Sequence, residues 1–177
     1  MKKRVLSALL SLCMLIGVIG MIPVTAEEAT PNVWDGTVAT AFAGGEGTEA
    51  SPYQIATGAQ LAYLAKCVNA GTADNSYASA HYQLTADIDL GGKGWAPIGS
   101  GDYDNNIFKG TFDGNGKTIK NLVWDGESYG QPSSSTGIGL FGVIGGNVVI
   151  KNLALTDVNL DSSNGATGAI AGYWKAD

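Results

Sequence analysis

Apolar residues follow three different patterns along the chain, and each pattern predicts a different kind of segment. An almost unbroken apolar run covers residues 5–24. Residues 57–70 carry apolar side chains at helical spacing, whereas the chain from residue 82 onward alternates apolar and polar side chains. The first pattern is typical of a leader or a membrane span, the second of an amphipathic helix and the third of half-buried strands. The chain is therefore predicted to be mostly β, with one helix.

The apolar run has the flanks of a secretory signal. Three cations precede it at residues 2–4, and the small residues V-T-A close it at 24–26, directly before two glutamates. This order predicts a cleavable signal peptide over residues 1–26. The alternative is a membrane anchor, because the run nears the length needed to span a bilayer. Lipid attachment at Cys13 is disfavoured, since a leucine precedes it where a small residue is expected.

Residues 27–50 are predicted to form an N-terminal tail and an extended arm, in which Trp34, Val38 and Phe42 alternate with small polar residues. The helix over 57–70 begins at Thr57, with Gln60 completing a capping box. It ends at Gly71, which tolerates a left-handed backbone. Its apolar stripe consists of Leu61, Leu64, Ala65 and Val68.

Alternation over residues 82–90 predicts one half-buried strand. Further strands are expected at 108–112 and 118–124, joined by a tight turn at D-G-N-G, residues 113–116.

Two short sequences recur along this β region. T-I-K-N-L at 118–122 returns as V-I-K-N-L at 149–153, and G-L-F-G at 139–142 is echoed at 168–172. Strand-rich self-similarity at a nearly fixed spacing predicts a β-solenoid with a continuous apolar interior. Asn121 and Asn152 are expected to stack as a ladder between coils. The expected interior residues are Ile119, Leu122, Ile150, Leu153, Leu155, Val158 and Leu160. The alternative is two similar strands of an ordinary sandwich, but the recurring glycines favour the solenoid.

Several segments together resemble the N-terminal region of bacterial surface proteins with GLUG-type repeats. They are Y-Q-I-A-T-G-A-Q-L-A-Y-L-A at 53–65, Y-Q-L-T-A-D-I-D-L at 82–90, W-A-P-I-G at 95–99, F-K-G-T-F-D-G-N-G-K-T-I-K-N-L at 108–122 and G-L-F-G at 139–142. The resemblance covers residues 50 to 172 and implies a right-handed parallel β-helix of the pectin-lyase-like kind. The helix at 57–70 is then expected to cap the first coil, because an uncovered solenoid end invites aggregation. The β-helix domain is expected over 51–177 and, because G-Y-W-K-A-D at 172–177 falls in mid-repeat, to be truncated at its C-terminus.

Charge narrows the classes of partner. Removing residues 1–26 takes three cations and no acid, which changes the formal net charge from −6 to −9 and leaves seven lysines and no arginine. That balance argues against nucleic acid and against an anionic membrane surface. Cys67 is the one cysteine that remains, so no intramolecular disulfide can form.

Four groups of residues have the composition of a site, and for each a structural role is favoured. Asp102, Asp104 and Asn106 alternate like calcium ligands, but the loop lacks the glycine and the closing glutamate of such a site. Asp87 and Asp89 resemble a glycosidase acid pair, yet the alternation places them on the polar face of a strand. A Cys67–His81 dyad is disfavoured, because Cys67 is expected to be buried. Aromatic side chains that could stack on sugars are Trp95, Trp124, Tyr129, Tyr173 and Trp174.

The sequence therefore predicts a secreted or cell-surface β-helix module with a structural, adhesive or carbohydrate-binding role. No catalytic residue, cofactor or metal is assigned, and the expected partners are host or cell-wall glycans or surface proteins. Two alternatives remain. One is an enzyme of the pectin-lyase-like fold, for which the chain is poor in basic residues. The other is a piece of a larger extracellular enzyme or peptidase.

Overall fold

The computed structural model describes residues 33–71, 76–99, 106–124, 137–161 and 165–176. Two helices accompany the strands in this part of the chain: α1 (Gly58–Asn69) and α2 (Ser76–Ser79). The strands are β1 (Tyr53–Ile55), β2 (His81–Leu84), β3 (Ile88–Asp89), β4 (Thr111–Lys120), β5 (Val123–Trp124), β6 (Phe141–Gly145), β7 (Val149–Thr156), β8 (Asn159–Leu160) and β9 (Ala171–Lys175). The mostly β composition expected from the alternation is confirmed. The predicted signal peptide lies outside the described residues.

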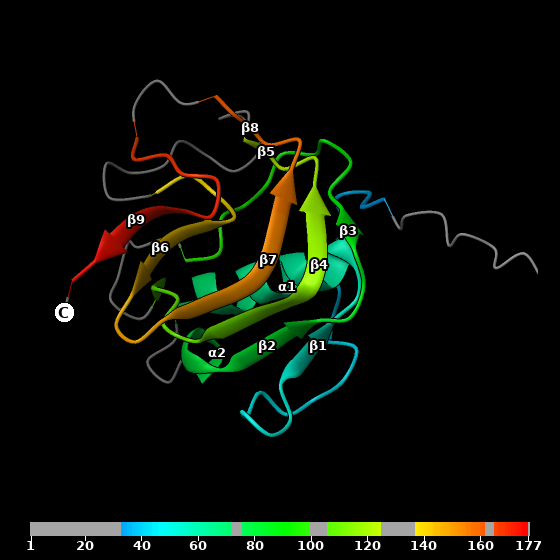
Figure 1. Cartoon of the computed structure of the whole chain (residues 1–177), viewed down its shortest axis with the longest axis vertical. Helices are drawn as coiled ribbons and strands as arrows, with labels where there is room; N and C mark the ends of the chain where they lie inside the picture. Colours follow the sequence, from blue (N-terminus) through cyan, green and yellow to red (C-terminus); the bar gives the residue numbers. More distant parts are fainter. Residues whose placement is uncertain (1–32, 72–75, 100–105, 125–136, 162–164, 177) are drawn as a thin grey trace, which may run out of the picture.

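All the pairs between these strands are parallel. The largest sheet joins β1, β2, β4 and β7 in chain order, with β3 also paired to β4. Two smaller pairs join β5 to β8 and β6 to β9. Figure 1 shows β7 and β4 running side by side through the same bend, with β9 beyond β6 on the left. Segments 29 to 38 residues apart along the chain therefore become neighbours, as in Tyr53 opposite Tyr82 and Phe112 opposite Ile150.

The predicted helix is confirmed as α1. The Thr57 hydroxyl accepts a hydrogen bond from the N–H of Gln60 at 3.2 Å, and the Gln60 side chain accepts one from the N–H of Ala56 at 2.8 Å. Both bonds satisfy backbone N–H groups at the N-terminal end of the helix, where such groups have no acceptor within the helix. The stripe expected from the sequence is buried. Cys67 lies at its edge and is half-buried.

The helix and the large sheet share one hydrophobic core. Leu61 and Leu64 belong to the same buried cluster as Tyr82, Phe112 and Phe141, and Figure 1 shows α1 behind β4 and β7. Each fully buried large side chain contributes roughly 1.5–3 kcal/mol to folding. The apolar row that the alternation predicted is thus the inner face of the sheet.

Two strand predictions were wrong in their boundaries. The expected strand at 82–90 is divided into β2 and β3. The expected turn at 113–116 is instead part of β4, which runs through it without reversing. Asn115 and Gly116 do have positive φ, of 51° and 71°. Because parallel neighbours continue on both sides, these two left-handed residues bend the strand and shift its register, as a β-bulge does.

The repeat prediction was right for one sequence and wrong for the other. Residues 138 and 141 pair with 167 and 171, so the two glycine-framed segments are neighbours. The two I-K-N segments are not opposite each other. Ile150 faces Phe112, whereas Ile119 faces Leu155. Paired residues of β4 and β7 lie 36 to 38 residues apart along the chain, whereas the two I-K-N segments are 31 residues apart, so these segments cannot be opposite each other.

The expected interior residues divide into two groups. Ile119 and Leu122 are fully buried. The other five, on or next to β7 and β8, are only partly buried against the core: Ile150, Leu153, Leu155, Val158 and Leu160. Among the described residues, β7 and β8 are paired on one side alone, which leaves these side chains less covered than those of β4.

Candidate functional site

The outer face of the large sheet carries two rows of side chains. Strand alternation points Tyr82 and Phe112 into the core, so the residues on either side of them point outward. One outward row runs His81, Thr111, Val149 across β2, β4 and β7. The other row runs Gln54, Gln83, Asp113, Lys151 from β1 to β7. The second row places polar groups at intervals of about 4.8 Å, the spacing of neighbouring strands, whereas the first row ends in the apolar Val149.

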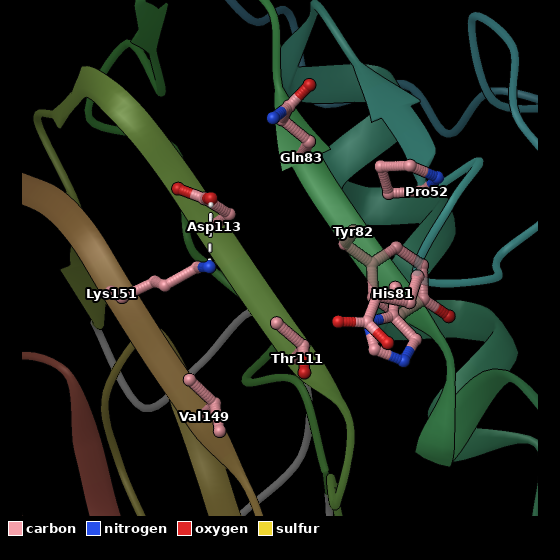
Figure 2. Close-up of a pocket in the computed structure, with 9 residues that line it drawn as sticks. Pro52, His81, Tyr82, Gln83, Thr111, Asp113, Val149 and Lys151 are labelled. Atoms are coloured by element: carbon pink, nitrogen blue, oxygen red, sulfur yellow. Dashed lines mark ion pairs between the residues drawn. The ribbon is translucent and has the colours of Figure 1, made fainter.

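A hollow of about 290 Å³ lies over these rows. It is lined by Glu49, Pro52, His81, Tyr82, Gln83, Thr111, Asp113, Val149 and Lys151. Figure 2 shows the lining residues on three successive strands, with Pro52 projecting from a neighbouring segment. The hollow offers an amide, a hydroxyl, an imidazole and charges of both signs. Such a mixture can exchange hydrogen bonds with a polar ligand such as a sugar.

Asp113 and Lys151 form an ion pair within the hollow, with the Lys151 Nζ 3.4 Å from the carboxylate (Figure 2). The other Asp113 oxygen accepts hydrogen bonds from the Asn115 N–H at 2.8 Å and from the Asn152 amide at 3.1 Å. Burial alone would raise the pKa of Asp113, but these hydrogen bonds and the lysine charge together hold it below its ordinary value. Asp113 is therefore an ionised, fully engaged carboxylate, which suits it to structure more than to proton transfer.

The same arrangement occurs a second time, away from the hollow. Asp89 lies 3.1 Å from Lys120 Nζ and accepts hydrogen bonds from the Asn121 amide at 2.7 Å and the Gly91 N–H at 2.8 Å. The bond from Asn121 is the main cause that lowers the pKa of Asp89, against an opposing effect of burial. We call each set an aspartate clamp: an Asp on one strand, a Lys opposite it and the Asn that follows that Lys.

The clamps correct the prediction of an asparagine ladder. Asn121 and Asn152 both have left-handed backbones, with φ of 57° and 53°, and each amide binds a different aspartate. They do not stack on each other. The recurrence of I-K-N did mark a repeated structural feature. That feature is the aspartate clamp, which occurs twice, and not a stack of asparagines. The aspartate partners could not be assigned without the register of the strands.

The loop that was considered and disfavoured as a calcium site is only partly described. Asp102 and Asp104 lie outside the described residues. Asn106 is buried, and its amide donates to the Asn69 carbonyl at the end of α1 at 3.4 Å. That contact ties the helix to the following segment. In the described part of the chain, no group of three or more His, Cys, Asp or Glu side chains is placed to hold a metal ion.

Asp87 and Asp89 do not form an acid pair in the structure. Asp87 is exposed and accepts a hydrogen bond from the Thr118 N–H at 2.8 Å. Asp89 is only 6% exposed and is held by its clamp. The predicted polar strand face was wrong for both residues: Asp87 is exposed but lies in the break between β2 and β3, and Asp89 is on β3 but buried.

The aromatic candidates fall into two environments. Trp95 is buried, and its indole N–H donates to the Leu140 carbonyl at 3.1 Å. Trp124 is also buried, whereas Tyr173 and Trp174 on β9 are exposed. Tyr129 lies outside the described residues. Core packing therefore accounts for two of the five candidates.

Cys67 and His81 have separate surroundings. Cys67 lies beside Tyr63, and the hydrogen bond between them is the main cause that raises the pKa of Tyr63 to about 12. Burial raises the pKa of the Cys67 thiol, opposite to what a nucleophile requires. His81 lines the hollow on the outer face. The favoured interpretation of Cys67 as a structural thiol agrees with these surroundings.

Comparison with known proteins gives two relatives, both much longer than this chain. A protein named as a Gly-rich membrane protein, from Evansella cellulosilytica, is 38% identical over 140 residues, which is 74% of this chain and 14% of that protein. Halomucin from Haloquadratum walsbyi is 36% identical over 147 residues, which is 78% of this chain and 2% of halomucin. No family model and no solved structure matches the chain. Among the described residues, no helix is long and apolar enough to cross a membrane.

Proposed function

We propose that this chain is an exported surface module built as a right-handed parallel β-helix, with α1 capping its first coil. The parallel pairing of β1, β2, β4 and β7 in chain order supports this architecture. Right-handedness follows from the strong preference of parallel crossover connections for that hand. The resemblance to GLUG-type repeat proteins, stated above on its motifs, leads to the same architecture.

Export and a surface location rest on the predicted signal peptide and on the relatives. One relative is named as a membrane protein and the other as halomucin. The net charge of −9 after signal removal suits a soluble outward-facing module, since like charges resist self-association. Within this proposal the module has a structural or adhesive role and no catalysis of its own.

The proposed ligand is a polysaccharide bound along the outer face of the sheet. The observation that carries this proposal is the hollow crossed by the outward row Gln54, Gln83, Asp113 and Lys151. This row places one polar side chain on each of four neighbouring strands, about 4.8 Å apart, so an extended polymer can make a polar contact on each strand. Gln83, Thr111 and His81 are free of the clamps and provide donors and acceptors for hydroxyl groups.

A second candidate is a portion of a larger extracellular protein that acts on polysaccharide or peptide elsewhere in its length. The observation that favours it is the size of the relatives, of which this chain matches only 14% and 2%. In that case the module positions or spaces another domain, and the hollow has no ligand.

A glycan array probed with the chain from residue 27 onward separates the two candidates. The array is read with and without calcium, and the bound glycans are checked for cleavage. Retained, uncleaved glycan supports the binding module, and cleaved product contradicts the absence of catalysis. Absence of binding favours the second candidate.

Paired variants then test the position of the site. Replacing both Gln83 and Thr111 by Ala should weaken glycan binding at least tenfold, since two hydrogen-bonding groups at about 1 kcal/mol each are lost. Lys93→Ala, at an exposed lysine outside the hollow, is the matched control and should leave binding unchanged. Equal effects of both changes would place the glycan elsewhere.

A further inference from the structure

The hollow on the outer face of the sheet is bordered by the loop that precedes β1, and this loop carries Glu49. Within the loop, the N–H and carbonyl of Thr48 bond the carbonyl and N–H of Ser51, both at 3.2 Å. The loop is also fastened to β2, because the Gly47 carbonyl accepts a hydrogen bond from the N–H of His81 at 2.9 Å. The backbone of Glu49 is therefore held at a defined place beside the hollow.

Four side chains that line the hollow can carry a charge near pH 7. Lys151 and Asp113 largely cancel each other, because the ammonium is 3.4 Å from the carboxylate. His81 counts as neutral at pH 7. Glu49 is exposed, and within the described part of the chain it takes part in no ion pair. The lining of the hollow therefore presents one uncompensated negative charge to a ligand, at its rim.

We propose that Glu49 makes the hollow selective for neutral polysaccharide over polysaccharide that bears carboxylate groups. This selectivity rests on the glycan-binding role proposed above and names the class of glycan. An anionic sugar in the hollow would bring a like charge close to Glu49, which costs binding energy. The hydroxyl groups of a neutral sugar can instead donate hydrogen bonds to the same carboxylate.

Lys151 does not reverse this preference, although it is the one lysine that lines the hollow among the described residues. Its ammonium is already held by Asp113, whose carboxylate also accepts hydrogen bonds from Asn115 and Asn152. To bind an anionic sugar, Lys151 would have to give up one carboxylate for another, which brings little gain. The net charge of −9 from residue 27 onward also opposes the approach of a polyanion at longer range.

Three matched pairs of 1,4-linked oligosaccharides test the selectivity: glucan with glucuronan, mannan with mannuronan and galactan with galacturonan. The members of each pair have the same linkage and differ in whether C6 is a hydroxymethyl group or a carboxylate. Their binding to the chain from residue 27 onward is measured by titration calorimetry at low and at high salt. In each pair that binds, the neutral member should bind at least about threefold more tightly at low salt. Added salt should reduce this preference, because it screens exposed charges.

Glu49→Gln should raise the affinity for the anionic members at least about threefold and change the affinity for the neutral members little. Glu46→Gln is the matched control. Glu46 is an exposed glutamate of the same loop that does not line the hollow, so its replacement removes the same charge from the chain at another position. It should leave the preference unchanged. Circular dichroism of both variants establishes that they remain folded.

The outcomes separate this selectivity from the glycan-binding role on which it rests. Binding of none of the six oligosaccharides would contradict glycan binding itself, and the selectivity with it. Anionic members bound as tightly as their neutral partners, or more tightly, would overturn the selectivity and leave glycan binding intact. Equal effects of Glu49→Gln and Glu46→Gln would attribute the preference to the overall charge of the chain and overturn the role of Glu49.

Discussion

The first and the last strand of the large sheet's run β1, β2, β4, β7 carry the same kinds of residue in different environments. On β1 and β2, Ile55 and Leu84 are fully buried in one cluster with the apolar side chains of α1. On β7, Leu153 and Leu155 alternate just as regularly but are only half-buried. The periodicity of a strand therefore determines which way a side chain points. A neighbouring strand is still needed to bury it.

The largest expected difference between the first strands and β7 is in core truncations. Leu84→Ala on β2 removes a side chain that has neighbours on all sides, and should cost about 2–5 kcal/mol of unfolding free energy. Leu155→Ala on β7 removes the same atoms from a half-buried position, and should cost about 1 kcal/mol. Urea titration measures both. Equal costs would show that Leu155 is as enclosed as Leu84.

The next effect concerns the two aspartate clamps. Asn121→Gly keeps a residue that accepts positive φ but removes the amide bond to Asp89, and should cost about 1.5 kcal/mol. Asn121→Ser should also lower the thermal midpoint, because it adds backbone strain at the left-handed position. Asn152→Gly should cost less than Asn121→Gly, since the Asp113 clamp is more exposed. The opposite order would contradict the difference in burial.

Acid should weaken both clamps. The pKa of Asp89 and of Asp113 is lowered in the folded chain, so each carboxylate stabilises the fold at pH values above its unfolded pKa near 3.8. That stability is lost as the pH falls through about 4 and then through the folded pKa. Urea midpoints measured between pH 7 and pH 3 should decline over the acid part of this range. Asp89→Asn should reduce the decline, and an unchanged profile would count against the clamp at that site.

The smallest effects belong to the outer hollow. Gln83→Ala and Thr111→Ala replace side chains for which we assign no part in the core or the clamps, and each should change stability by less than about 0.5 kcal/mol. A thermal melt of each variant checks this. A large loss of stability would mean that these residues support the sheet, and any effect on glycan binding would then be indirect.

Much of the fold could be predicted from local patterns. The capping box at Thr57 and Gln60 gave the start of α1, and the period-two alternation around Tyr82 and Leu84 gave the inner face of β2. Both depend on contacts within a few residues. The sequence does not distinguish the bend in β4 at Asn115 from a turn, because both contain left-handed residues. Only the pairing with parallel neighbours on both sides shows that the strand continues.

Local sequence patterns could not predict the register of the strands or which residues line the hollow. The match between the two I-K-N segments suggested a direct stack, but unequal connections place Ile119 opposite Leu155 instead. The aspartate of each clamp comes from a preceding strand, so its role follows only from the register. The hollow also combines Glu49 with residues of β2, β4 and β7, which no single stretch of sequence contains.

The most direct test of this difference between the strands is amide hydrogen exchange of the chain from residue 27 onward. Strand β4 has neighbours on both sides, so its amides should exchange slowest, with β2 close behind. The amides of β7 and β9 should exchange markedly faster, because each has one paired edge. Protection of β7 and β9 equal to that of β4, or faster exchange at β1 than at β7, would contradict a sheet in which β1 is covered by residues 43–44 while β7 and β9 are paired on one side among the described residues.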